Sequence, residues 1–92
     1  MNLKDELSGV FRVFTGSGSV YTVDLTQGTL CREVFTHGLR GDGVALELLG
    51  VVNCSVGLGA MFVVQMPGVV GPTLRLTSRV TQILVSESSG AV

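Results

Sequence analysis

The sequence predicts an all-β fold, a small antiparallel meander curled into a barrel or roll of about six or seven strands, with a short N-terminal helix. Thirteen glycines and two prolines supply the tight turns that many short strands need. The apolar residues are mostly β-branched or Leu, and Trp is absent, which favours strands over helices. We expect the sheet to curl because a flat open sheet leaves reactive edges.

Length and charge limit the domain organisation and the partners. At 92 residues the chain has room for one core, so we expect a single β domain over residues 1–86 and a flexible tail over residues 87–92. The net charge of -1 excludes a strongly basic binder of nucleic acid or anionic membranes. The first seven residues are polar and charged where a secretory leader would be apolar, so the expected location is the cytoplasm.

The helix is expected at about residues 2–8. Leu3 and Leu7 are four residues apart with acidic residues between them, and Asn2 can cap the start. Gly9 can end the helix in a left-handed conformation. Beyond Gly9 the apolar period changes to near two, which is typical of strands.

Seven strand-like segments follow, separated by stretches rich in glycine or small polar residues. The Gly-Ser-Gly-Ser stretch at residues 16–19 has the backbone freedom that a hairpin requires. Ser78 is expected to separate the last two strands. The expected strands are residues 10–15, 20–25, 29–35, 44–52, 60–66, 73–77 and 79–86.

The middle of the chain is unusually apolar, because no Asp, Glu, Lys, Arg or His occurs from Leu48 to Leu74. A transmembrane helix is not expected, since glycines and prolines interrupt the stretch. An ordinary barrel strand alternates apolar and polar residues, whereas residues 44–52 and 60–66 are apolar on both expected faces. A second protein molecule that covers the outer face explains such strands.

We therefore expect a non-enzymatic small interaction or assembly protein that self-associates, or binds a host protein, through an apolar β surface. An exposed apolar patch of several hundred Å² promotes aggregation of a monomer, so a symmetric homo-oligomer is the simplest arrangement. The predicted interface residues are Phe62, Val64, Met66, Val69 and Val70.

No arrangement of residues predicts catalysis, a metal site or a cofactor. His37 is the only histidine, and it lies among glycine-rich loop residues. Cys31 and Cys54 lack metal-ligand spacing and are expected as buried free thiols. The acidic residues of the expected strands are assigned to a solvated outer face: Asp24, Glu33 and Glu47.

The segment LRGDGVAL, residues 39–46, resembles the second signature of Sm-like RNA-binding proteins. In that family the arginine side of the turn faces uridine-rich RNA, and small barrels with an N-terminal helix assemble into rings. The first signature of the family is not visible around residues 31–36. The resemblance implies an alternative function, an Sm-like or OB-like nucleic-acid-binding module that uses Arg12, Arg32 and Arg40.

Three further stretches resemble short uncharacterised reading frames of actinobacteria and their phages, including mycobacteriophages. This resemblance implies a phage accessory product that acts in the host cytoplasm, and it assigns no activity. The stretches are GSGSVYTVDLTQGTLC at residues 16–31, LRGDG at residues 39–43 and TSRVTQI at residues 77–83.

Overall fold

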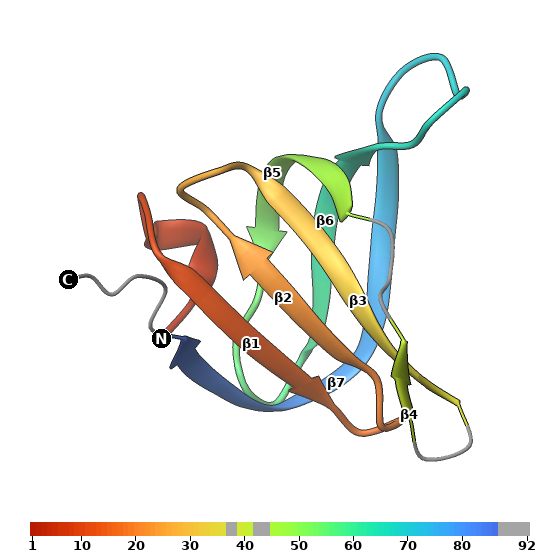
Figure 1. The fold of residues 1–92 in the computed structure, drawn as a ribbon. Coiled ribbons are helices and arrows are strands. Elements are labelled where there is room, and N and C mark those ends of the chain that lie inside the picture. The colour runs from red at the N-terminus through yellow and green to blue at the C-terminus, as the bar shows by residue number, and fades with distance from the viewer. Residues whose placement is uncertain (37–38, 42–44, 87–92) are drawn as a thin grey trace, which may run out of the picture.

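The computed structural model describes residues 1–36, 39–41 and 45–86, with only the backbone described for residues 34–36 and 39–41. Over these residues the chain forms seven strands around one interior (Figure 1). The strands are β1 (Val10–Thr15), β2 (Val20–Asp24), β3 (Thr29–Thr36), β4 (Leu39–Gly41), β5 (Ala45–Asn53), β6 (Gly59–Gln65) and β7 (Thr73–Ser86).

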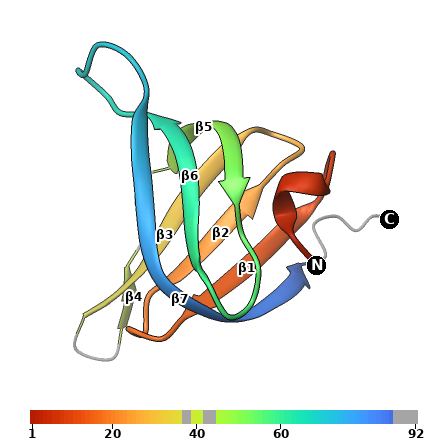
Figure 2. The same ribbon diagram turned by 180° about the vertical axis from the view of Figure 1, so that it is seen from behind.

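Six of the strands close into an antiparallel barrel. β1, β2, β3, β5, β6 and β7 each pair with the next along the chain, and β7 returns to pair with β1. Views from opposite sides show these strands wrapped around a common interior (Figures 1 and 2). β4 lies outside the ring, pairs with the end of β3, and falls where the sequence predicts a loop. The predicted all-β meander is confirmed.

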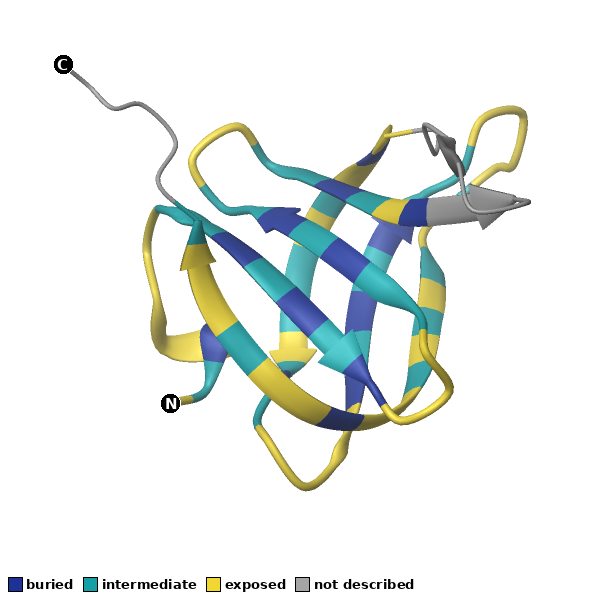
Figure 3. Cartoon of the chain, turned by 60° about the horizontal axis from the view of Figure 1, so that its bottom comes forward, coloured by how far each residue is buried: buried dark blue, intermediate teal, exposed yellow. Residues whose placement is uncertain are grey.

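The barrel interior is filled by side chains from alternate positions of the strands. Buried residues alternate with half-buried ones along β1, β2 and β6 (Figure 3). The Tyr21 ring lies 6.4 Å from the Phe62 ring, centroid to centroid. Burial of these side chains provides the main driving force for folding. The largest fully buried side chains are Phe62, Leu3, Leu30, Val13, Val23, Val64, Val80 and Cys54.

The N-terminal segment is bonded to the turn that follows β5. Asn2 Oδ1 accepts a hydrogen bond from the Cys54 backbone N–H at 2.9 Å, and the Leu3 N–H donates to the Cys54 carbonyl at 3.0 Å. These bonds hold the Leu3 side chain in the core, where it is 1% exposed. A segment outside the sheet thereby contributes one of the largest core residues.

The N-terminal helix is shorter than the predicted residues 2–8, because only a 3-10 turn over Leu3–Asp5 forms. Glu6 is already extended, and Leu7 is 94% exposed. Leu7 thus buries little surface against the barrel, and short helices with little tertiary packing are marginal. Among the described residues, no helix has the length and hydrophobicity needed to cross a bilayer.

β7 is one bent strand of 14 residues where the sequence predicts two. Its first half, to Arg79, pairs with β6, and its second half, from Val80, pairs with β1. The register shifts in both ladders near this junction, which is how β-bulges bend a strand. Ser78 lies within the bend and does not end the strand, so this one element closes the barrel.

β5 contains two register shifts that change which side chains face the core. The shifts lie between Leu48 and Gly50 and between Val51 and Asn53. Leu48 and Val51 both pack against the core although they are three residues apart. Strict alternation would place them on opposite faces. The apolar character of both expected faces of this strand is therefore explained in part by bulges within the barrel itself.

Candidate protein interaction surface

Two neighbouring strands present an apolar row on the outside of the barrel. On β7, Leu74 and Leu76 are 57% and 63% exposed. They pair with Val63 and Met61 of β6, and paired residues of an antiparallel ladder project from the same face. Arg75 pairs with the buried Phe62 and so belongs to the other face. We call Met61, Val63, Leu74 and Leu76 the outer apolar wall.

The β6–β7 hairpin projects from the barrel beside this wall (Figure 1). Its tip carries Val69 and Val70, which are 47% and 102% exposed. Gln65 holds the turn in shape, because its Nε2 donates to the Val69 carbonyl at 2.6 Å and to the Met66 carbonyl at 3.2 Å. We call Val69 and Val70 the hairpin tip, a projection that presents apolar side chains to solvent.

The structure corrects the predicted interface. Phe62 and Val64 are fully buried and face the barrel interior, so they cannot contact a partner without unfolding. Met66 is half-buried and packs against the core. Val69 and Val70 lie at the surface, and their role in an interface stays a prediction. Phe62, Val64 and Met66 alternate along the chain and so share one face of the strand, as predicted. That face is the inner face of the barrel.

Sequence reasoning missed Leu74 and Leu76 as surface candidates. The alternation in TLRLT, residues 73–77, indicates that the two leucines share a face. The alternation does not indicate whether that face is exposed to solvent or faces the core. The answer depends on the pairing with β6, where the leucines lie opposite Met61 and Val63.

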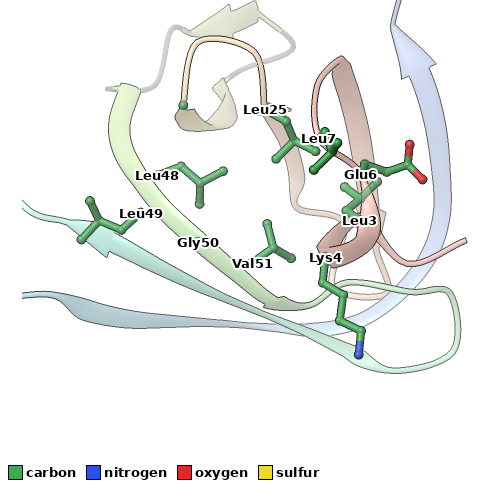
Figure 4. Close-up of a pocket in the computed structure, with 10 residues that line it drawn as sticks. Leu3, Lys4, Glu6, Leu7, Leu25, Leu48, Leu49, Gly50 and Val51 are labelled. Atoms are coloured by element: carbon green, nitrogen blue, oxygen red, sulfur yellow. The ribbon is translucent and has the colours of Figure 1, made fainter.

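A pocket of about 240 Å³ lies between the N-terminal turn, β5 and the β2–β3 turn (Figure 4). Leu48 and Val51 of β5 face Leu3, Leu7 and Leu25 across it. Leu49, Gly28 and Gly50 complete the lining together with Lys4 and Glu6, whose charged ends extend away from the centre. The lining therefore combines aliphatic side chains with a comparable share of polar surface.

Arg12, one of the arginines of the nucleic-acid hypothesis, is already paired. Arg12 donates from Nε to Glu33 Oε2 at 3.0 Å and from Nη2 to Oε1 at 2.8 Å. The Thr22 hydroxyl adds a hydrogen bond to the same carboxylate at 3.3 Å. The Glu33 side chain is only 5% exposed. Its predicted place on a solvated face is wrong, because the Arg12 and Thr22 side chains lie over it.

The described arginines of the nucleic-acid hypothesis do not share a face of the sheet. Arg12 aligns with Thr22, whereas Arg32 aligns with Tyr21, the neighbouring position. Arg32 donates to the Ser19 hydroxyl at 3.1 Å. Arg40 lies on β4, and its side chain is outside the described residues. Nucleic-acid binding stays a prediction, and Arg12 and Arg32 belong to different faces of the sheet.

The cysteines differ in burial. Cys54 is a fully buried free thiol, as predicted, and burial raises the pKa of this thiol to about 11. Cys31 is only half-buried. Within the described residues no cluster of three or more His, Cys, Asp and Glu side chains could hold a metal ion. His37 and the predicted tail, residues 87–92, lie outside the described part of the chain.

The fold and surface together define a small closed antiparallel barrel with an apolar outer wall and a projecting apolar hairpin. The chain matches no protein-family profile, and searches of curated proteins and of solved structures find no significant match. The functional argument therefore depends on the chemistry of this surface.

Proposed function

We propose that the protein is a non-enzymatic assembly module that self-associates through the outer apolar wall. The observation that carries the proposal is the exposure of Leu74 and Leu76 beside Met61 and Val63 on adjacent strands. A barrel closed on itself has no second layer to cover these side chains. A second copy of the chain supplies that layer.

The energetics favour association when such a wall is covered. Removing a few hundred Å² of apolar surface from water contributes several kcal/mol at about 25 cal/mol per Å², before the cost of association. The four wall residues carry no charge, so covering the wall does not bury an unpaired charge that belongs to it. Because the same wall is present on every copy, two copies can meet face to face around a twofold axis.

The proposal is tested by the mass of the protein in solution. We expect the wild-type chain to sediment at a multiple of its 9.6 kDa mass and Leu76→Asp to shift the population to single chains. A carboxylate placed in the covered wall would be desolvated without a partner, which is costly. Leu76 is 63% exposed, so the substitution leaves the barrel core intact. Analytical ultracentrifugation over a range of concentrations measures the change.

Gln82→Asp is the matched control, since Gln82 is an exposed residue of the same strand outside the wall and the substitution adds the same charge. This control should retain the wild-type mass. A wild-type chain that remains single at every concentration contradicts the proposal. So does a Leu76→Asp chain that is folded by circular dichroism and assembles as the wild type does.

A further inference from the structure

The first half of β7 is paired along only one of its two edges. Residues 73–76 pair with β6, whereas the pairing with β1 begins at Val80. The turn that follows β1 reaches no further than Ser78, whose hydroxyl accepts a hydrogen bond from the Ser17 N–H at 3.2 Å. Among the described strands, none pairs with residues 73–77 on that side, and Figure 2 shows this half of β7 at the margin of the barrel. We call residues 73–77 the free edge.

The direction of the backbone groups shows what the free edge presents. The Ala60 N–H points towards β7, because it donates to the Thr77 hydroxyl at 2.9 Å. Backbone groups alternate in direction along a strand, so Phe62, two residues further on, also directs its N–H and C=O towards β7. Its partner there is Arg75. The two wall leucines of β7, which flank Arg75, therefore direct their N–H and C=O groups towards the free edge.

Such an edge selects a β-strand as its partner. A row of unpaired N–H and C=O groups is a template that another extended backbone completes. No proline occurs within residues 73–77, and Arg75 is the one charged residue among them. Pro72 limits the edge on one side and the bend at Ser78 limits it on the other. The favoured occupant is therefore a single short extended segment.

The second half of β7 does not offer an equivalent surface. Residues 80–86 pair with β1, and their exposed large apolar residues are Leu84 and Val85. These two are consecutive, so they project from opposite faces of the strand. In the first half, by contrast, Leu74 and Leu76 share the wall face with Met61 and Val63. The free edge is thus continuous with the outer apolar wall, the surface for which self-association is proposed.

A second copy of the chain carries a suitable strand in its own free edge. Two identical strands that pair antiparallel are related by a twofold axis, so the contact is the same for both copies and closes on itself. Paired residues of an antiparallel ladder project from the same face. The wall leucines of the two copies would therefore lie side by side, and the two walls would form one continuous apolar face.

We infer that the free edge pairs antiparallel with the free edge of a second copy. This inference rests on the proposed self-association and adds a backbone contact to the wall. Arg75 limits the register, because a pair centred on it would set two like charges directly opposite each other. A pair centred on Leu74 or on Leu76 instead sets Arg75 opposite a threonine, Thr73 or Thr77.

Amide hydrogen exchange, measured by NMR, tests the pairing residue by residue. In the single chain the Arg75 N–H is bonded to β6 and should exchange slowly, whereas the Leu74 and Leu76 N–H groups should exchange fast. When nine chains in ten are paired, exchange at the two leucines should slow by about tenfold relative to dilute protein. Backbone protons of residues 73–77 should also show nuclear Overhauser effects between labelled and unlabelled chains.

Leu74→Pro and Leu74→Ala form a matched pair of variants. Both remove the same leucine side chain from the wall, but only proline removes the N–H at the free edge. Proline is tolerated in a strand where its N–H would face solvent, so both chains should fold, which circular dichroism checks. Leu74→Ala should retain the slowing at Leu76 when the protein is concentrated, and Leu74→Pro should lose it.

Fast exchange at Leu74 and Leu76 in fully assembled protein overturns the inference, and so does equal behaviour of the two variants. The wall still stands in that case if Leu76→Asp separates the chains. Backbone contacts between copies of Leu76→Asp, with assembly unchanged, would instead overturn the wall and support the edge. Slow exchange at both leucines in a chain that always sediments at 9.6 kDa would mean that the chain covers its own edge, which overturns the inference.

Discussion

Arg12 and Glu33 illustrate how a single residue's role depends on its neighbours across two strands. Arg12 reaches past β2 to form two hydrogen bonds with the Glu33 carboxylate on β3. A charged group with only 5% of its side chain exposed needs such partners. Sequence alone identifies both residues as surface candidates but not as a pair. Arg12 is consequently engaged in supporting the barrel, which weakens its candidacy as a phosphate ligand.

Cys54 makes the stability of the protein depend on pH in the alkaline range. Its pKa is raised from 9.0 to about 11 by burial. Below about pH 9 the thiol is protonated in both the folded and the unfolded chain, so it does not make the free energy of unfolding depend on pH. Between pH 9 and 11 the unfolded chain releases the proton while the folded chain retains it. Stability therefore falls as pH rises, by at most about 1.4 kcal/mol per pH unit from this group.

Denaturant unfolding at pH 8 and pH 10.5 measures this loss, with Cys54→Ala as the reference variant. Other groups that titrate in this range affect both proteins alike, so the difference between them isolates the thiol. Wild-type protein should lose more stability than Cys54→Ala over the interval. Equal losses in the two proteins would mean that the folded thiol titrates normally.

At the scale of elements, the closure of the barrel depends on the close passage of β7 over the start of β6. A Cβ atom on Gly59 would lie 2.7 Å from the Thr77 carbonyl oxygen. The Ala60 N–H donates to the Thr77 hydroxyl at 2.9 Å in place of a regular ladder bond. Both observations belong to the register shift between Gly59 and Met61. Only glycine fits at position 59, because a Cβ atom would clash with a backbone oxygen that cannot move aside as a flexible side chain could.

We predict that Gly59→Ala lowers the free energy of unfolding by about 1–3 kcal/mol, the usual cost of overpacking. Gly50→Ala is the control, since a Cβ there meets no atom within 4 Å and the backbone needs no positive φ. Denaturation midpoints of the two variants measure the difference. If Gly59→Ala is as stable as Gly50→Ala, the two strands do not approach as closely as described.

The irregular strands also show where sequence-based prediction succeeds and where it stops. The bounds of β1 and β6 follow the predicted ranges within a residue or two, because alternation and flanking glycines are local signals. The bulges of β5 and β7 are not local, since an extra residue exists only relative to its partner strand. The solvent-exposed face of β6 and the exposure of Leu74 and Leu76 likewise depend on strand pairing, so local sequence signals do not identify them.

At the scale of the whole molecule, one small core has to stabilise a chain whose outer wall is also apolar. Native domains are marginally stable, by about 5–15 kcal/mol. β7 is largely exposed along its length (Figure 3), and it contributes Leu74 and Leu76 to the wall. Covering that wall would add stability that depends on a second copy. Folding and association are then linked by mass action.

This linkage predicts that thermal stability rises with protein concentration. For a dimer that unfolds to two single chains, a tenfold rise in concentration adds about 1.4 kcal/mol per dimer. We expect the wild-type Tm to increase by a few degrees per tenfold concentration, and the Tm of Leu76→Asp to stay constant. Calorimetry of both proteins over a hundredfold range provides the measurement. A constant wild-type Tm would indicate that folding is complete in the single chain.

The amino-acid sequence by itself determines the all-β class, the single core, the positions of most turns and the uncharged stretch in the middle of the chain. These properties depend on composition and on periodicity over a few residues. The tertiary structure alone decides which apolar face is hidden, that Glu33 is buried against Arg12, and that residues 73–77 of β7 pair along only one edge within the described part of the chain. These depend on strand register and bulges, because a shift of one residue exchanges the inner and outer faces of a strand.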